Sequence, residues 1–389
     1  MFHNRMEKRL RFESLEKKQL LAADLTVAVI DGDLVITGDA EPNSFVLRSG
    51  VADGGQFKFE LGIAGDTINN EVPDAFNTLY SGITGNVLIN TGSGDDSVRI
   101  FGGSNTDDLD PLIFPGDLRI DLGDGDDELA MGSSLSNPDS QLPLSISDDL
   151  IVEGGTGDDY FEFTAVRVAD DFTVVDTQGS NTLTLPFPIY QDSDESTSVG
   201  DDFTIVMGSG NDDISINRAI VNDNLLVSVD GGDDIVNGLL TTVSGSTLVS
   251  LGNGNDFLSL SLFDAGRTLS VVGSGTNDIG LGEVTATSFI TIVTTNGNDV
   301  VGIDASSTGI LSISTGDGND EVEIFDSAFE LLFVKLGKGD DVLALEEVVV
   351  SKLALLNGGQ GYDSLVDLGG NDINLELDLA FEMLEEFVV

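Results

Sequence analysis

Residues Leu251–Ala265, LGNGNDFLSLSLFDA, contain the unit that decides the fold. A turn, GNGND at Gly252–Asp256, passes directly into a segment in which apolar and polar residues alternate. Two glycines within three residues favour a tight turn, and alternation with a period of two is typical of a β-strand. The unit therefore predicts a turn followed by a half-buried strand.

The same unit recurs along the chain in the form G-x-G-[ND]-D-x-h-x-h, where h is apolar. Copies include TGSGDDSVRI at Thr91–Ile100, TGDGNDEVEI at Thr315–Ile324 and LGKGDDVLAL at Leu336–Leu345. The last acidic or amide residue of the turn returns every 21 or 22 residues from Asp256 onward, and every 22, 31 or 32 residues before it. A fixed period in this range indicates a solenoid.

Two positions of the turn carry most of its acidic and amide side chains. We call the last of them the sixth-position residue and the one before it the fifth-position residue; at one turn either Asp233 or Asp234 fits the sixth position. The sixth-position residues are Asp96, Asp127, Asp159, Asn181, Asp212, Asp234, Asp256, Asn277, Asp299, Asp320, Asp341 and Asp363.

The strand that follows each turn has apolar residues two and four positions after the sixth-position residue, as Leu258 and Leu260 do after Asp256. A second alternating strand precedes the turn. Stacking of successive coils about 4.8 Å apart would pair their backbones and fill the interior with ladders of apolar side chains. We therefore expect an all-β protein, a right-handed parallel β-helix solenoid of about 12–15 coils with mostly 21–22 residues per coil.

The chain divides into four predicted segments. Residues 1–24 form a basic targeting or disordered segment, 25–90 an N-terminal cap with the first irregular coils, 91–374 the repeat β-helix and 375–389 a C-terminal cap, either a strand or a short helix. The extra residues of the longer coils lie in insertions around 105–114, 133–144 and 186–199. Insertions of this kind bulge from one side of a solenoid and often bind a ligand.

Composition limits the possible functions. The chain has 389 residues with 69 acidic and 16 basic side chains, a net charge of −53. This charge excludes nucleic acid as an expected partner, since phosphate binding requires a basic surface. The chain has no Cys and one His, so neither a disulfide nor a thiolate metal site can form. No apolar run approaches the length that spans a bilayer, so we expect no transmembrane segment.

The turns are candidate calcium sites. We expect their carbonyl groups to face outward beside the acidic side chains, and stacked coils to bring equivalent carboxylates to about 5 Å from one another. Such a column of like charges calls for a hard cation with six to eight oxygen ligands, which describes Ca²⁺. The predicted ligands are Asp96, Asp127, Asp159, Asp212, Asp234, Asp256, Asp299, Asp320, Asp341 and Asp363 at the sixth position, with Asp95, Asp126, Asp158, Asn255, Asn319 and Asp340 at the fifth.

The turns resemble the hemolysin-type, or RTX, calcium-binding nonapeptide G-G-x-G-x-D-x-U-x. Gly154–Glu162 and Gly358–Val366 match it throughout, and most other copies lack only the first glycine. The resemblance implies several Ca²⁺ ions held between stacked turns by glycine carbonyls and the sixth-position aspartate. This chain departs from the family in having one unit per coil, an amide at Asn181 and Asn277, and Thr295 in place of a glycine.

The N-terminal segment resembles the LEPR-XLL element of planctomycete surface and secreted proteins through Arg9, Phe12-Glu13, Leu15–Leu21 and Ala22-Ala23. Lys17-Lys18 stands where that element has Pro-Arg. Together with the repeat, this resemblance implies an extracellular or cell-surface protein with a structural or adhesive role. Its expected partners are calcium ions and surface glycans or matrix components.

Three other interpretations are open. A polysaccharide lyase or hydrolase is one, because β-helices carry such activities and acidic pairs are abundant. However, no catalytic constellation is recognisable, and we expect no enzyme activity. Mineral binding by acidic ladders is the second, and ice binding is disfavoured because Thr-x-Thr segments are isolated. The third is a turn ladder that holds only water and diffuse counter-ions, since Gly, Asn and Asp also favour turns without metal.

Overall fold

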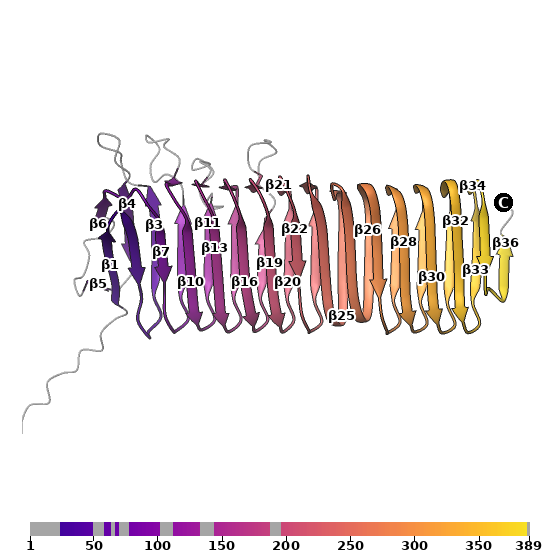
Figure 1. The fold of residues 1–389 in the computed structure, drawn as a ribbon. Coiled ribbons are helices and arrows are strands. Elements are labelled where there is room, and N and C mark those ends of the chain that lie inside the picture. The colour runs from indigo at the N-terminus through magenta and orange to yellow at the C-terminus, as the bar shows by residue number, and fades with distance from the viewer. Residues whose placement is uncertain are drawn as a thin grey trace, which may run out of the picture.

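The described part of the chain is a parallel β-helix solenoid, which confirms the predicted fold class (Figure 1). Its strands are stacked side by side along one long axis, with the N-terminal strands at one end and the C-terminal strands at the other. The structure, a computed structural model, describes residues 24–49, 58–63, 67–69, 78–101, 112–132, 144–186 and 196–386.

Each coil contributes strands to three parallel columns. In one coil these are β10 (Leu118–Asp124), β11 (Glu128–Gly132) and β12 (Leu144–Ile146). The next coil repeats the order with β13 (Leu150–Thr156), which pairs with β10 so that Leu118 lies opposite Leu150. Equivalent residues of successive coils are therefore neighbours, as a solenoid requires.

The other strands before residue 245 follow the same three columns. The first column also contains β2 (Asp33–Thr37), β7 (Val87–Asn90), β16 (Phe172–Gln178), β19 (Phe203–Ser209) and β22 (Leu225–Ser228). The second contains β3 (Ser44–Ser49), β8 (Ser97–Phe101), β14 (Tyr160–Thr164), β17 (Thr182–Leu185), β20 (Asp213–Asn217) and β23 (Ile235–Leu239). The third contains β9 (Ile113–Phe114), β15 (Val166–Val168), β18 (Ser198–Val199), β21 (Ile220–Val221) and β24 (Thr242–Val243).

Further along the chain the strands are longer and continue around corners. The longest are β25 (Ser246–Asp264) and β26 (Thr268–Thr294), which pair in parallel over most of their length. The strands that follow are β27 (Val300–Asp304), β28 (Ser307–Asp317), β29 (Glu321–Phe325), β30 (Ala328–Lys338), β31 (Val342–Glu346), β32 (Val349–Gln360), β33 (Ser364–Gly369), β34 (Asp372–Ile373), β35 (Glu376–Leu379) and β36 (Met383–Glu386).

The N-terminal strands differ from the coils because some of them are antiparallel. Strand β1 (Asp24–Ile30) pairs antiparallel with β2, and β4 (Lys58–Ile63) pairs antiparallel with both β3 and β6 (Thr78–Ser81). Strand β5 (Thr67–Ile68) pairs in parallel with β1. At the other end β35 and β36 form the last coil in strand conformation, and most of the three predicted insertions lie outside the described residues.

Ladders of inward-pointing apolar side chains form the core. In the first column Leu118, Leu150, Phe172 and Phe203 are equivalent residues, and each is completely buried. The rings of Phe172 and Phe203 stack with centroids 4.5 Å apart and planes at 8°. Since burial of one such side chain contributes about 1.5–3 kcal/mol, these ladders are the main source of stability.

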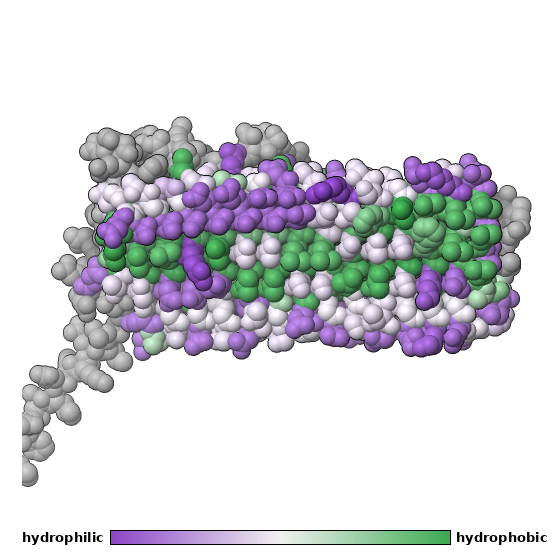
Figure 2. All heavy atoms as spheres, in the orientation of Figure 1, coloured by the Kyte–Doolittle hydropathy of each residue, from purple (hydrophilic) through white to green (hydrophobic). Residues whose placement is uncertain are grey.

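The outer surface carries both apolar and polar side chains. Figure 2 shows a band of apolar residues that runs lengthwise along one side of the solenoid, with rows of hydrophilic residues beside it. Exposed large apolar side chains along the chain include Leu248, Val272 and Phe289, each about two-fifths exposed. No part of the chain that the structure describes covers this band.

Candidate metal centre

The sixth-position residues form a buried row at the corner between the first and second columns. Asp127, for example, lies between the end of β10 and the start of β11. Every sixth-position side chain from Asp96 to Asp363 is at most 2% exposed, and each points into the solenoid. The period-two alternation of the following strand explains this direction, since Leu129 and Met131, two and four residues after Asp127, are also buried. We call these residues the inner row.

Except at Asn277, one oxygen of each inner-row side chain accepts a hydrogen bond from the backbone of the preceding coil. The Asp96 N–H donates to Oδ1 of Asp127 at 2.7 Å, and the Asp127 N–H donates to Oδ1 of Asp159 at 2.7 Å. The amide residue Asn181 takes part in the same way, accepting from the Asp159 N–H at 3.0 Å. The row therefore satisfies buried backbone donors at a corner where the strand ladder is interrupted.

The other oxygen of each inner-row aspartate is buried and has no hydrogen-bonding partner. An unpaired carboxylate oxygen away from water is unfavourable, and a bound cation or a proton removes the cost. The unpartnered atoms are Oδ2 of Asp96, Asp127, Asp159, Asp212, Asp234, Asp256, Asp299, Asp320, Asp341 and Asp363. The inner row thus combines a structural contact through Oδ1 with a free ligand atom at Oδ2.

The electrostatics of the row oppose ionisation. Burial, together with the neighbouring carboxylates Asp159 and Asp96 of the same row, raises the pKa of Asp127 to about 7. Burial likewise raises the pKa of Asp212, Asp256 and Asp341 to about 6 in each case. Without a cation these four aspartates therefore hold protons at a pH where exposed aspartates are fully ionised.

The fifth-position residues form a second row that faces solvent, which we call the outer row. Their side chains accept hydrogen bonds from the coil that follows: Asp95 accepts the Asp126 N–H at 3.1 Å, and Asp126 accepts the Asp158 N–H at 2.9 Å. The structure thus separates the predicted ligands into a buried set and an exposed set. The predicted ligands in the exposed set are Asp95, Asp126, Asp158, Asn255, Asn319 and Asp340.

The turn carbonyl groups point along the stack, not outward as the sequence suggested. The carbonyl of Gly92 accepts the Asp124 N–H at 3.0 Å, and that of Thr295 accepts the Asp317 N–H at 3.1 Å. Glycine is needed here because adjacent turns are in backbone contact. A Cβ at Gly339, whose φ is +138°, would lie 1.6 Å from the carbonyl oxygen of Gly318. These carbonyls keep one lone pair each for another contact.

Asp176 is the one buried carboxyl group of the described residues that lies outside the inner row. It occupies the first position of the turn, where its neighbour in the next coil is Met207. Its Oδ1 accepts the Gln178 N–H at 3.3 Å, and its Oδ2 has no partner. Burial and the facing carboxyl group of Asp159 raise the pKa of Asp176 to about 8.

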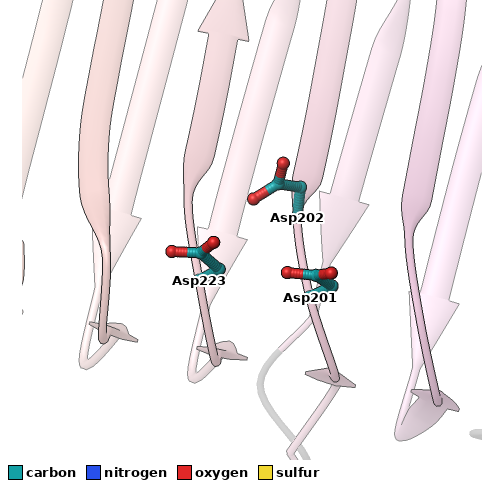
Figure 3. A group of neighbouring side chains, drawn as sticks. All are labelled: Asp201, Asp202 and Asp223. Carbon is teal, nitrogen blue, oxygen red and sulfur yellow. The ribbon is translucent and has the colours of Figure 1, made fainter.

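A second acidic corner, between the third and first columns, was missed by the sequence reasoning. Asp201 and Asp202 precede β19 and lie beside Asp223 of the next coil (Figure 3). Their carboxylate oxygens lie within 4.8 Å of one another, and among the described residues this is the group of three side chains close enough to share an ion. The group is partly exposed, and nothing in the structure marks a bound ligand there.

The signal for this second corner was present in the sequence. Paired acidic or amide residues precede an apolar residue at Asp148-Asp149, Asp170-Asp171, Asp201-Asp202 and Asp223-Asn224. They recur with the same 22- and 31-residue spacings as the glycine turns. Hydrogen bonds such as Asp202 N–H to Asp171 Oδ1, at 3.0 Å, join successive coils here as they do in the outer row.

The inner row fits a hard divalent cation better than other metals. It offers only oxygen atoms, whereas Zn²⁺ prefers nitrogen and sulfur ligands. Ca²⁺ accepts irregular sets of carboxylate and carbonyl oxygens, while Mg²⁺ requires near-octahedral geometry and retains water. The buried Oδ2 atoms and the free lone pairs of the turn carbonyls supply ligands of this type.

Comparison with protein-family models, with curated proteins and with solved structures gives no match for this chain. Within the described residues, no helix is long and apolar enough to cross a membrane. The function is therefore inferred from the two rows and their chemistry.

Proposed function

We propose that this protein is a calcium-binding structural solenoid in which Ca²⁺ is held by the inner row and stabilises the stack of coils. The observation that carries the proposal is the set of buried aspartate Oδ2 atoms without a hydrogen-bonding partner. At neutral pH a column of such carboxylates needs positive charge, and the chain has 16 basic residues against 69 acidic ones. The described ion pairs, such as Arg119 with Glu153, lie on the surface and supply none to the row.

The resemblance to the RTX nonapeptide supports the same proposal. In that family the sixth-position aspartate and glycine carbonyls share Ca²⁺, and here the sixth-position aspartates bear the unpartnered oxygens. The outer row is then a solvent-facing hydrogen-bond ladder with a smaller part in metal binding. Asn181 keeps the backbone contact of the row, whereas Oδ1 of Asn277 has no partner. Neither amide offers a carboxylate, so we expect fewer ions than coils.

We further propose a location outside the cell or on its surface, with an adhesive or matrix role. Free Ca²⁺ is abundant in that environment, and a protein without cysteine can be made rigid by metal in place of disulfides. The resemblance of residues 1–24 to the LEPR-XLL element supports export, and surface glycans or matrix components are the partners that this location suggests.

Calcium dependence is tested by thermal melting of the metal-stripped protein with and without added Ca²⁺, followed by circular dichroism. We expect Ca²⁺ to raise Tm, since a ligand that binds only the folded state stabilises it. Adjacent residues give a matched pair of variants. Asp127→Asn changes the inner row and should reduce the increase in Tm, whereas Asp126→Asn changes the outer row and should preserve it. A Tm that is indifferent to calcium and to chelator would refute the proposal.

A further inference from the structure

Asp176 brings a second buried carboxyl group to the inner row at one place only. In the other coils the equivalent inward position is occupied by apolar side chains such as Leu122, Leu251 and Leu336 or by smaller residues. Asp176 is 1% exposed and Asp159 is 2% exposed, so neither carboxyl group reaches solvent. A buried carboxyl group with an unpartnered oxygen is unfavourable unless something binds it.

The two carboxyl groups converge on the space beside Gly154. A Cβ built on Gly154 would lie 2.2 Å from Oδ2 of Asp176 and 2.8 Å from Oδ2 of Asp159. The absence of a side chain at Gly154 is therefore what allows both oxygens to occupy this space. Both atoms lack a hydrogen-bonding partner, and no described ion pair involves either residue.

Asn181, the inner-row residue of the same coil as Asp176, contributes another buried polar atom without a partner. Its Oδ1 accepts the Asp159 N–H at 3.0 Å, which fixes the orientation of the amide. Its Nδ2 group is then a buried donor without an acceptor. The other inner-row amide has the opposite orientation: Nδ2 of Asn277 donates to Oδ1 of Asp299 at 2.9 Å, and its Oδ1 is the atom without a partner.

We propose that Asp159 and Asp176 form a divalent-cation site for Ca²⁺, in which Asp176 adds to the inner row a carboxylate that the other turn sites lack. Two carboxylates match the charge of one divalent ion, and a water molecule on that ion satisfies the Asn181 Nδ2 donor. Asp176 lies outside the acidic positions of the repeat, so this site does not require that the other turns bind metal. Because it has one carboxylate more than a repeat site, it should bind its ion more tightly.

The test uses Tb³⁺, which replaces Ca²⁺ and emits when a nearby aromatic side chain is excited. The chain has no Trp, and two of its four Tyr residues adjoin the relevant aspartates. Tyr160 follows Asp159, and Tyr362 precedes Asp363 of a repeat turn. The Tyr160→Phe and Tyr362→Phe variants therefore separate emission at the Asp159–Asp176 site from emission at an ordinary turn site.

We expect full-length protein to show Tyr160-dependent emission that saturates at the lowest Tb³⁺ concentration and is displaced by Ca²⁺. Asp176→Asn should weaken the apparent affinity of that component at least tenfold and leave the Tyr362-dependent component unchanged. Asp176→Leu introduces the residue that several other coils have at this position, so we expect the variant to fold. It should weaken the Tyr160-dependent component as Asp176→Asn does. Asp363→Asn should affect only the Tyr362-dependent component.

Two results would overturn the inference. One is Tyr160-dependent emission that is unchanged in Asp176→Asn, which would place the ion on the outer surface near Glu162. The other is an absence of Tyr160-dependent emission, with Asp176→Asn raising Tm in metal-free buffer, which would mean that the pair holds a proton. Loss of the Tyr362-dependent component alone would instead count against calcium at the repeat turns.

Discussion

The Oδ1 atom of Asp341 accepts the backbone N–H of Asp320, one coil away, at 2.9 Å, while the Oδ2 atom of the same carboxyl group has no partner. This single contact separates two roles of the inner row. Oδ1 serves the backbone and can be replaced by an amide, whereas Oδ2 is available to a cation. Substitutions at Asp341 can therefore test the two roles separately.

Replacing Asp341 by Asn keeps the Oδ1 acceptor and removes the charge. Asn181 shows that an amide in this row can keep the contact, since its Oδ1 accepts the Asp159 N–H at 3.0 Å. In metal-free buffer at pH 8 we expect Asp341→Asn to match or exceed the wild-type Tm, because a buried negative charge disappears. In calcium the order should reverse, since the variant has lost a ligand.

Replacing Asp341 by Ala removes the acceptor as well. The Asp320 N–H is then buried without a partner, which costs about 1–3 kcal/mol. We expect Asp341→Ala to melt below Asp341→Asn both with and without calcium. Equal Tm values for the two variants in metal-free buffer would show that the backbone contact is unimportant. Melting temperatures are the suitable measure because solenoids need not unfold in two states.

The raised pKa values of the inner row predict the pH dependence of the metal-free protein. Burial raises the pKa of Asp127 to about 7 and that of Asp212 and Asp256 to about 6. A group with a raised folded-state pKa stabilises the fold fully below its unfolded-state pKa, about 4, and loses that contribution as pH rises through the folded-state value. We therefore expect Tm of the metal-stripped protein to fall between about pH 4 and pH 7.

Saturating Ca²⁺ should reduce this fall, because the cation replaces the protons. Melting curves at unit pH steps, in stripped buffer and in excess Ca²⁺, measure both series. A Tm that rises from pH 4 to pH 7 in stripped buffer would contradict the raised pKa values and favour a row that is ionised without metal.

Calcium binding should release into solution the protons that the inner-row carboxyl groups hold in the metal-free protein. At pH 6 the metal-free row is partly protonated, and Ca²⁺ requires the carboxylate form. Titration calorimetry in two buffers with different enthalpies of ionisation measures the number of protons released per ion. We expect a net release at pH 6 that decreases toward pH 8. Identical heats in both buffers at pH 6 would mean that the ion binds carboxylates that are already ionised.

The glycines of the turn have a role in stacking that does not depend on metal. Gly339→Ala should lower stability by about 2–4 kcal/mol, because its Cβ would overlap the Gly318 carbonyl oxygen and its φ of +138° disfavours a side chain. Gly302 is the matched control, since a Cβ there meets nothing within 4 Å. Gly302→Ala should leave Tm unchanged or raise it slightly. Similar losses in both variants would refute the stacking argument.

The sequence was sufficient to predict the solenoid but not the division of the turn into two rows. The repeat period and the apolar residues after each turn predict the coil directly. The inward direction of the sixth-position aspartate can also be obtained from the sequence. Asp96, Val98 and Ile100 are two residues apart, so an alternating strand places them on the same face, and all three are buried. The sequence prediction assigns parity to the apolar residues but not to the turn, so it places both acidic positions in one site.

Other features could not be predicted from the repeat. The role of Asp176 depends on its lying beside Gly154 in the preceding coil. The residue type at the first position of the turn varies from coil to coil, so the residue in one coil does not predict the residue in the next. Carbonyl direction depends on how closely the turns stack, which the glycine spacing alone does not determine. The second acidic corner has a sequence signal but no glycines, so it was not distinguished from ordinary strand boundaries.

The corner after the second column provides a test of backbone strain. Residues at this corner adopt the left-handed conformation without being glycine, as Ala305 does with φ of 49°. This conformation costs an L-residue about 1–2 kcal/mol, which glycine does not incur. Glycine instead lowers the stability of the folded protein by about 0.4–1 kcal/mol relative to alanine, because its unfolded chain has greater entropy. Ala305 is exposed, so its methyl group contributes little to packing. We therefore expect Ala305→Gly to raise stability by up to about 1 kcal/mol.

Ala328→Gly, at an exposed position in β30, is the control and should lower stability by about 0.5–1 kcal/mol. Melting of the two variants beside wild type measures the difference, and a lower Tm for both would mean that hydrogen bonds along the stack, and not local strain, determine the conformation of this corner.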